Sequence, residues 1–299
     1  MAVELKVLAP GDISKPTPYT IAIVSNPAIE APWKSNQFVV DPITTQPAAF
    51  TASTTYIVDS LFGRLPGQAE ALLADPTIGP FVRIVSLRVT GLDPSGATAL
   101  VAQDSVSNML VARRLPLAAF LKAHGVSADV AYAVSASESH TRASAWYTSD
   151  DDGRAGVAFM LDGATLSHRF WCTVPGTIAI HTSSNSLTAL HEFQHAASSY
   201  TNGEVADLYV DSSPALNCKS GRPIPALFSS YAGTAIASDP LRDGIGYPAG
   251  WQSYHAALHD PGRPAVMDNY YMTASPERCQ NDVITRMFLQ DRLRAKISR

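Results

Sequence analysis

The 299-residue chain has few cysteines, little charge and no long hydrophobic run. Its three cysteines are widely spaced and form no C-x-x-C pair, so a zinc site built from cysteines is not expected. No stretch approaches the roughly 20 apolar residues that a membrane-spanning helix needs, and we expect no membrane span.

Charged residues make up 16% of the chain, the net charge is −4, and there is no long run of Lys or Arg. This composition argues against nucleic acid or an anionic membrane as the main partner, because both attract clustered positive charge. The first residues, MAVELKVLAPGD, lack the basic start and apolar core of a secretory signal. The localisation stays open between a cytoplasmic protein, secretion by a non-standard route and a secretory signal that is absent from this sequence.

Apolar runs of strand length and runs with helical spacing predict an α+β fold, a mixed twisted sheet that carries helices. The predicted strands are Glu4–Leu8, Tyr19–Val24, Phe81–Val89, Asp129–Val134, Ala143–Tyr147, Gly156–Leu161, His168–Val174 and Thr177–Thr182. The predicted helices are Ala52–Arg64, Gln68–Leu73, Leu110–Ala123 and Val283–Ile297. Because residues 205–250 are rich in Pro, Gly, Ser and Asp, we expect an N-terminal α/β subdomain at 1–203 and a looser one at 204–299. A cleft would lie between them.

The most informative stretch is SLTALHEFQHAASSYTNGE, residues 186–204, which contains an H-E-x-x-H pattern. Apolar residues at three-to-four spacing predict that it is helical, with a start near the Ser/Asn run 183–186 and an end at Asn202-Gly203. At about 100° per residue, His191, Glu192 and His195 share one sector of such a helix. Two imidazoles one turn apart, beside a carboxylate, are the arrangement that binds a catalytic zinc ion.

A catalytic zinc site commonly has three protein ligands, and the third is open in this sequence. Glu204 follows the Asn202-Gly203 break directly, so a chain reversal there would bring its carboxylate back toward the histidines. Asp207 is the alternative third ligand, and Asp211, His255 and His259 are further candidates. Glu192 is the predicted general base, which takes a proton from the attacking water and passes it to the leaving group.

HEFQH resembles the signature of the zincin metallopeptidases, which hold it on a helix packed under a twisted sheet. The segment RPAVMDNYYM, residues 263–272, resembles the Met-turn of the metzincin branch, with Met267 as the methionine beneath the metal. The resemblance implies zinc at His191 and His195, and it implies Tyr270 as a catalytic residue that stabilises the oxyanion. The chain departs from the metzincin pattern because Ser198 and Thr201 stand where that pattern has a glycine and the third ligand.

Together these features predict a zinc-dependent peptidase, with Zn²⁺ as cofactor and a peptide or protein as substrate. The substrate would add to the exposed edge of the sheet, for which Gly156–Leu161 is the expected strand. One rival interpretation is a zincin-fold binding module that has lost turnover. The other is a structural metal site that joins the two subdomains and leaves no position for water.

Overall fold

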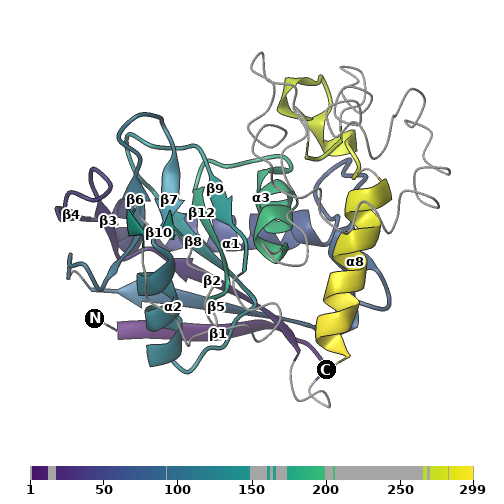
Figure 1. Ribbon diagram of the computed structural model, residues 1–299, viewed down its shortest axis with the longest axis horizontal. Coiled ribbons are helices and arrows are strands. Elements are labelled where there is room, and N and C mark those ends of the chain that lie inside the picture. Colours follow the sequence, from purple (N-terminus) through teal and green to yellow (C-terminus); the bar gives the residue numbers. More distant parts are fainter. Residues whose placement is uncertain are drawn as a thin grey trace.

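The computed structural model describes residues 2–12, 18–91, 93–148, 160–161, 164–165, 174–198, 205, 265–267, 270–281 and 283–298. The described part is an α+β fold around a mixed six-stranded sheet in the order β1-β5-β2-β8-β12-β9 (Figure 1). The strands are β1 (Ala2–Pro10), β2 (Tyr19–Ser25), β5 (Val82–Thr90), β8 (Val130–Ser135), β9 (Ser144–Trp146) and β12 (Gly176–His181). The central strands β5, β2, β8 and β12 are parallel, and β1 and β9 run antiparallel at the two edges.

A second sheet, in the order β4-β3-β6-β7, lies beside the first and was not foreseen from the sequence. Its strands are β3 (Ala28–Glu30), β4 (Phe38–Val40), β6 (Ala99–Gln103) and β7 (Leu110–Ala112). A two-stranded hairpin joins β10 (Met160–Leu161) to β11 (Ala164–Thr165). The described helices are α1 (Pro47–Leu61), α2 (Arg114–Ala123), α3 (Thr188–Ala197) and α8 (Val283–Ile297), with short 3₁₀ turns at Pro42–Thr45, Leu72–Ala74, Gly79–Phe81, Tyr270–Met272 and Pro276–Arg278.

Both faces of the six-stranded sheet are buried, as strand β2 shows. Ile21 and Ile23 contribute to a core shared with α1, α3 and α8, and Ala22 and Val24 contribute to a second core shared with α2 and the small sheet. All seven residues of β2 are buried. A parallel strand covered on both faces is expected to be apolar throughout, so the YTIAIVS run gave a clear signal in the sequence.

Most predicted strands of the main sheet are confirmed, but three helix predictions need correction. Helix α1 begins at Pro47 rather than Ala52, because proline suits the first helical turn. Gln68–Leu73 was wrongly predicted as a helix, and only a 3₁₀ turn at Leu72–Ala74 is present. The predicted helix Leu110–Ala123 is strand β7 followed by α2. Of the predicted strands Gly156–Leu161 and His168–Val174, all but the short β10 and Val174 lie outside the described residues.

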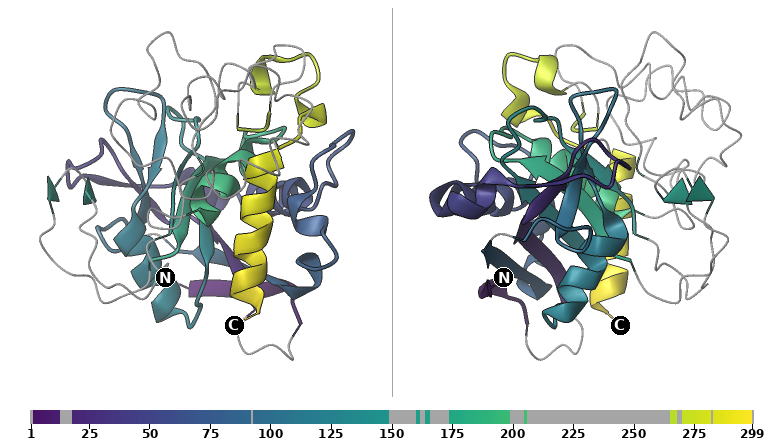
Figure 2. Two further views of the ribbon diagram at one scale, coloured as in Figure 1. Left: turned by 45° about the vertical axis from the view of Figure 1, so that its right-hand side comes forward. Right: turned by 90° about the vertical axis from the view of Figure 1, so that its left-hand side faces the viewer.

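The C-terminal helix α8 has the predicted bounds and stands beside α3 (Figures 1 and 2). Its apolar residues Leu289 and Leu293 enter the core that also holds Ile21 of the main sheet. The expected boundary at 203/204 lies outside the described residues. Helix α8, which belongs to the predicted subdomain 204–299, shares a hydrophobic core with the N-terminal part of the chain.

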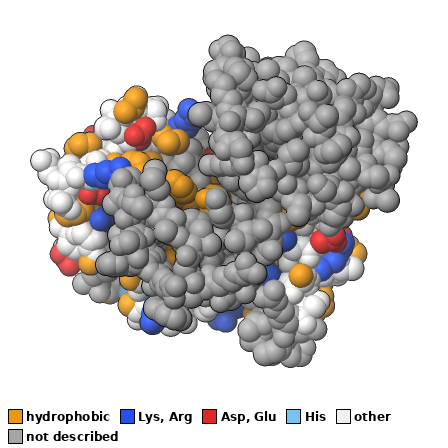
Figure 3. Space-filling view, viewed as in Figure 1, with side chains coloured by type: hydrophobic (Ala, Val, Ile, Leu, Met, Phe, Trp, Pro, Cys, Tyr) orange, Lys and Arg blue, Asp and Glu red, His pale blue; other side chains and the backbone are white. Residues whose placement is uncertain are grey.

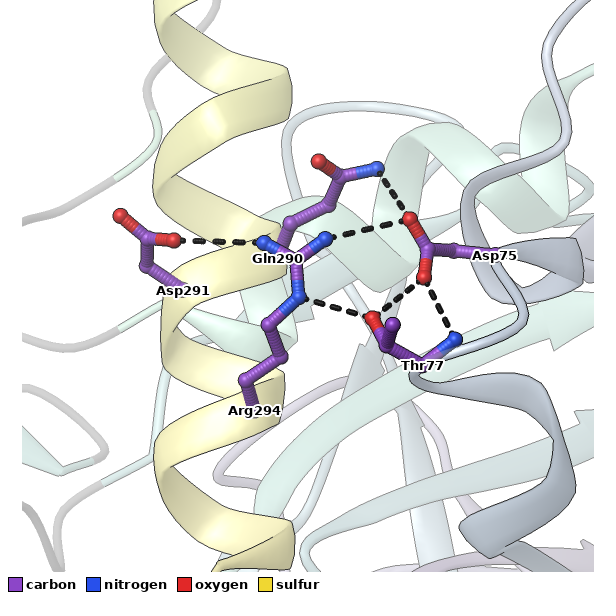
Figure 4. Close-up of polar contacts among 5 residues, drawn as sticks. All are labelled: Asp75, Thr77, Gln290, Asp291 and Arg294. Carbon is purple, nitrogen blue, oxygen red and sulfur yellow. Dashed lines mark hydrogen bonds and ion pairs between the residues drawn. The ribbon is translucent and has the colours of Figure 1, made fainter.

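Hydrogen bonds and ion pairs connect helix α8 to the loop that follows α1. Figure 4 shows Arg294 and Gln290 of α8 converging on the carboxylate of Asp75, at 3.1 and 3.2 Å. Thr77 bonds the other carboxylate oxygen of Asp75 through its backbone N–H, at 2.8 Å. One turn earlier, Arg286 donates to Glu70 at 2.8 Å. In the part of the chain that the structure describes, no helix is both long and apolar enough to cross a membrane.

Candidate metal centre

Helix α3 carries the H-E-x-x-H pattern, as the sequence predicts, but a side chain from α1 caps its start. Leu187, in the N-cap position, has no capping side-chain bond. The Tyr56 hydroxyl instead accepts a hydrogen bond from the N–H of Ala189 at 3.1 Å and donates one to the carbonyl of Asn185 at 2.8 Å. The predicted caps at 183–186 were therefore wrong, because a residue 133 positions away satisfies the free N–H of the first turn.

The helix also ends earlier than predicted. Ser198 is extended, with φ −86° and ψ 177°, so α3 stops at Ala197 rather than at Asn202-Gly203. The Arg292 side chain of α8 donates to the Ala197 carbonyl at 2.9 Å. A guanidinium at this position satisfies an unpaired carbonyl and complements the negative end of the helix dipole.

The two histidines of the pattern turn corresponding nitrogens toward each other. The Nε2 atoms of His191 and His195 are 3.3 Å apart. The Nδ1 atom of His191 is 2.8 Å from the carbonyl oxygen of Val266, and that of His195 is 2.7 Å from the carbonyl oxygen of Val205. Because a carbonyl only accepts hydrogen bonds, both Nδ1 atoms carry the proton.

This hydrogen bonding fixes the tautomer of each neutral imidazole. With Nδ1 protonated, each Nε2 carries a lone pair, and two lone pairs 3.3 Å apart cannot hydrogen-bond to each other. The contact becomes favourable when a cation lies between the two nitrogens, either a metal ion or a proton taken up by one ring. Histidines that bind a metal ion commonly donate their other ring N–H to a backbone carbonyl or a carboxylate, and both of these rings are bonded to a carbonyl.

Glu192 lines the same cleft as the two histidines, in agreement with the shared helix sector predicted from the sequence. The cleft has a volume of about 730 Å³ and runs from α3 along strand β9 to the small sheet. The exposed fractions of Glu192 and His191 are 9% and 7%, so both groups are largely withdrawn from solvent. A withdrawn carboxylate beside a cleft is suited to proton transfer to a bound substrate.

Tyr270 reaches the site from the 3₁₀ turn Tyr270–Met272. Its ring centroid is 5.5 Å from that of His191, and its hydroxyl is 3.1 Å from Oγ1 of Thr188. Burial raises the pKa of Tyr270, against the opposing effect of the Thr188 hydrogen bond. The phenol is therefore protonated at neutral pH and available as a hydrogen-bond donor.

Met267 is completely buried and belongs to the core that also contains α3. The residue before it, Val266, provides the carbonyl that orients His191. The segment expected to form a Met-turn therefore contacts the His191 ring through its backbone, while Met267 itself packs as a core residue. Tyr132 is a further contact of α3, and its hydroxyl donates to the Ala189 carbonyl at 2.9 Å.

The candidates for a third ligand, Glu204, Asp207, Asp211, His255 and His259, lie outside the described residues. Within the described ranges, no group of three or more His, Cys, Asp or Glu residues is arranged to hold a metal ion. Cys279 is a buried free thiol, and the other two cysteines are not described.

Two neighbours of the site, Tyr56 and Arg142, were missed by the sequence interpretation. Tyr56 is far from the motif in sequence, and only its place on a predicted helix could be read from the pattern. Arg142 directly precedes a predicted strand, and the cleft that it lines forms only in the folded chain.

Comparison of the chain with family models, with curated proteins and with solved structures gave no match.

Proposed function

We propose that this protein is a zinc-dependent peptidase of the zincin type, with His191 and His195 as zinc ligands and Glu192 as general base. The observation that carries the proposal is the 3.3 Å separation of the two Nε2 atoms. In each ring the other nitrogen, Nδ1, is hydrogen-bonded to a backbone carbonyl. Two nitrogen ligands at about 2.0–2.1 Å from a tetrahedral ion lie about 3.3–3.4 Å apart. The donor pair thus fits zinc in both spacing and protonation.

The contact between His195 and Val205 supports a third ligand from the same segment. The Val205 carbonyl bonds Nδ1 of His195, so the chain returns to the histidines directly after Glu204. Glu204 remains the first choice for this ligand, and Asp207 remains the alternative.

The side chains of the cleft suit hydrolysis of a peptide bond. When bound, zinc lowers the pKa of a water molecule toward about 7 and polarises the scissile carbonyl. Glu192 takes a proton from the attacking water and passes it to the leaving amine. The protonated hydroxyl of Tyr270 donates a hydrogen bond to the oxyanion as charge develops there.

Strand β9 is the best candidate for binding an extended peptide. It is the edge strand of the main sheet on the side of α3 among the described strands, and Ser144, Ala145 and Trp146 all line the cleft. A peptide can add its backbone to such an edge. This position replaces the expected edge Gly156–Leu161, whose described residues Met160 and Leu161 belong to a separate hairpin.

Metal analysis of the purified protein, combined with a peptide-cleavage assay, tests the proposal. We expect about one zinc per chain, lost in His191→Ala, and cleavage that a chelator abolishes and added zinc restores. Parallel metal analysis of Glu204→Ala, Asp207→Ala and His255→Ala identifies the third ligand. If the protein binds no transition metal even after zinc is supplied, the proposal is contradicted. The remaining explanation for the short contact between the histidines is then a proton shared by the two rings. Zinc without cleavage of any peptide points instead to an idle binding module or a structural site.

A further inference from the structure

Among the described residues that line the cleft, Arg142 has the only positively charged side chain. Its guanidinium makes no hydrogen bond or ion pair within the described part of the chain. The other arginines near this region are engaged. Arg113 pairs with Glu30 at 3.0 Å, and Arg114 donates to the Tyr147 carbonyl at 2.8 Å. Arg142 is exposed, so its charge is available to a molecule that enters the cleft.

The backbone that carries Arg142 is held firmly on both sides. The N–H of Arg142 donates to the Asn108 carbonyl at 3.0 Å, and its carbonyl accepts from the N–H of Leu110 at 2.8 Å. The side chain of Asn108 bonds the neighbouring Thr141 at both its backbone N–H and its hydroxyl, at 2.8 and 3.2 Å. A free guanidinium on a fixed backbone loses less entropy when it binds a ligand than one on a mobile loop.

The strand register places Arg142 at one end of the cleft. Ser144 of β9 pairs with Ala179 of β12, while at the other end of β9 the N–H of Thr148 donates to the Ser198 carbonyl, after the end of α3. Arg142 precedes Ser144 by two residues, about 7 Å along an extended strand. It therefore lies toward the start of α3, where Ser183 and Asn185 also line the cleft.

The surroundings of Arg142 strengthen an ionic contact. Trp33, Met109 and Val111 contribute apolar side chains to the cleft wall. A ligand that covers these groups together with the exposed Arg142 excludes water and strengthens an ion pair there. The described surface in Figure 3 mixes hydrophobic side chains with both signs of charge, and the whole chain has a net charge of −4. Among the described residues of the cleft, the unpaired cation of Arg142 is thus a local feature, opposite in sign to the net charge of the chain.

We propose that Arg142 binds a carboxylate of the substrate, so that the cleft selects peptides with a negative charge a few residues from the cleaved bond. The planar guanidinium matches a carboxylate through two parallel hydrogen bonds. The carboxylate comes from an Asp or Glu side chain or from the peptide's C-terminus. This inference depends on the proposed peptidase function, and the experiment below separates the two.

The test is a digestion of a peptide library by the zinc-loaded full-length protein, with the cleaved bonds located by mass spectrometry. We expect bonds at a fixed distance from a carboxylate to be cleaved about tenfold more often, the effect of one charge-assisted hydrogen bond. An acidic side chain as the source gives Asp or Glu at a constant position relative to the cleaved bond. A C-terminal carboxylate gives a constant distance from the peptide end instead.

Arg142→Gln should abolish the preference while cleavage of neutral peptides continues, and Arg142→Glu should reverse it toward Lys and Arg. Arg83→Gln is the matched control, because Arg83 is an exposed arginine of β5 that does not line the cleft. The Arg83→Gln protein should show the same preference for carboxylate-containing peptides as the wild type. Cleavage without any carboxylate preference, or a preference that survives in Arg142→Gln, overturns the inference and leaves the peptidase function intact.

A binding measurement tests the inference even if no peptide is cleaved. The immobilised Glu192→Gln protein should retain the untreated peptide library better than the same library after methyl esterification, which removes every carboxylate. The Glu192→Gln, Arg142→Gln double variant should lose this difference. Equal retention of both libraries by the Glu192→Gln protein rules out the carboxylate site, whatever the outcome for catalysis.

Discussion

Each imidazole of the H-E-x-x-H pattern uses its two nitrogens for different purposes. In both rings Nδ1 bonds a backbone carbonyl, which fixes the ring plane, and the two Nε2 atoms face each other 3.3 Å apart. The carbonyls belong to Val266 and Val205, so segments on either side of the undescribed region orient the motif. Hydrogen bonds to backbone carbonyls thus hold both rings in a fixed orientation.

The residue between them, Glu192, can be tested without disturbing this arrangement. Glu192→Gln keeps the size of the side chain and both histidines but removes the base. We expect zinc content to stay within about twofold of the wild type and kcat to fall by about 10²- to 10⁴-fold. Zinc analysis and a peptide-cleavage assay on the same sample check this.

Glu138→Gln, at an exposed glutamate of the loop after β8, is the control and should retain normal turnover. Full activity of Glu192→Gln would remove Glu192 from the mechanism.

Tyr56 is predicted to act on stability and metal binding through the start of α3. Tyr56→Phe removes the acceptor for the Ala189 N–H and the donor for the Asn185 carbonyl. We expect the free energy of unfolding to fall by about 1–2 kcal/mol, as for the loss of a helix cap, and zinc affinity to weaken. Urea unfolding measures the first effect. Tyr271→Phe, at a residue that is 61% exposed, should change stability much less; equal losses in the two variants would refute a capping role.

At the scale of elements, α3 lies against β12 at the closest approach that two backbones allow. A Cβ added at Gly176 would stand 2.0 Å from the carbonyl oxygen of Ala196 and 3.0 Å from its Cα. No side-chain movement can relieve a clash with backbone atoms. Gly176 therefore lets the motif helix pack directly on the sheet.

Gly176→Ala should accordingly destabilise the protein by about 3 kcal/mol or more, the upper range for overpacking. Because α3 must move to accept the methyl group, zinc affinity should fall as well. Gly96→Ala is the matched control, since its new Cβ would meet only the Phe38 ring at an ordinary 3.4 Å. Thermal unfolding of both variants gives the comparison, and similar melting temperatures would contradict the close-packing argument.

Sequence periodicity predicted the long elements but missed the short strands of the small sheet. The strand at Tyr19–Val24 and the helix at Val283–Ile297 are long enough for their apolar pattern to identify them. Strands β3, β4 and β7 have three residues each, too few to show an alternation. Local signals also misplaced both ends of α3, because Tyr56 and Arg292 provide its terminal contacts from distant parts of the chain.

At the scale of the whole molecule, the C-terminal helix completes the core that begins with the N-terminal strands. Leu289 and Leu293 share a core with Ile21 and Phe193, so the two ends of the described chain stabilise the sheet and the motif helix together. Composition alone suggested a looser subdomain after residue 203 that forms one catalytic unit with the first part. It could not reveal this packing, because helical periodicity shows that a face is apolar and not which surface covers it.

The ion pair between α8 and the loop after α1 provides a pH-dependent test of that packing. Hydrogen bonds from Thr77, reinforced by the charge of Arg294, lower the pKa of Asp75 below its usual value of 3.8. A carboxyl whose pKa is lower in the folded state stabilises the fold above its unfolded pKa, and this contribution is lost as the pH falls through the folded pKa.

Asp75→Asn should therefore lower the free energy of unfolding by about 1 kcal/mol at pH 7. The effect is modest because Asp75 is only partly buried and its partner Arg294 is 39% exposed, so water screens the pair. The gap from the wild type should narrow as the pH falls below about 4, where the wild-type carboxylate also takes up a proton. Urea unfolding of both proteins from pH 7 to pH 3 measures this difference in unfolding free energy. Asp93→Asn, at an exposed aspartate whose side chain has no contact of this kind in the described chain, should match the wild type throughout. A gap that stays constant or widens in acid would show that the ionised Asp75 carboxylate does not hold α8 in place.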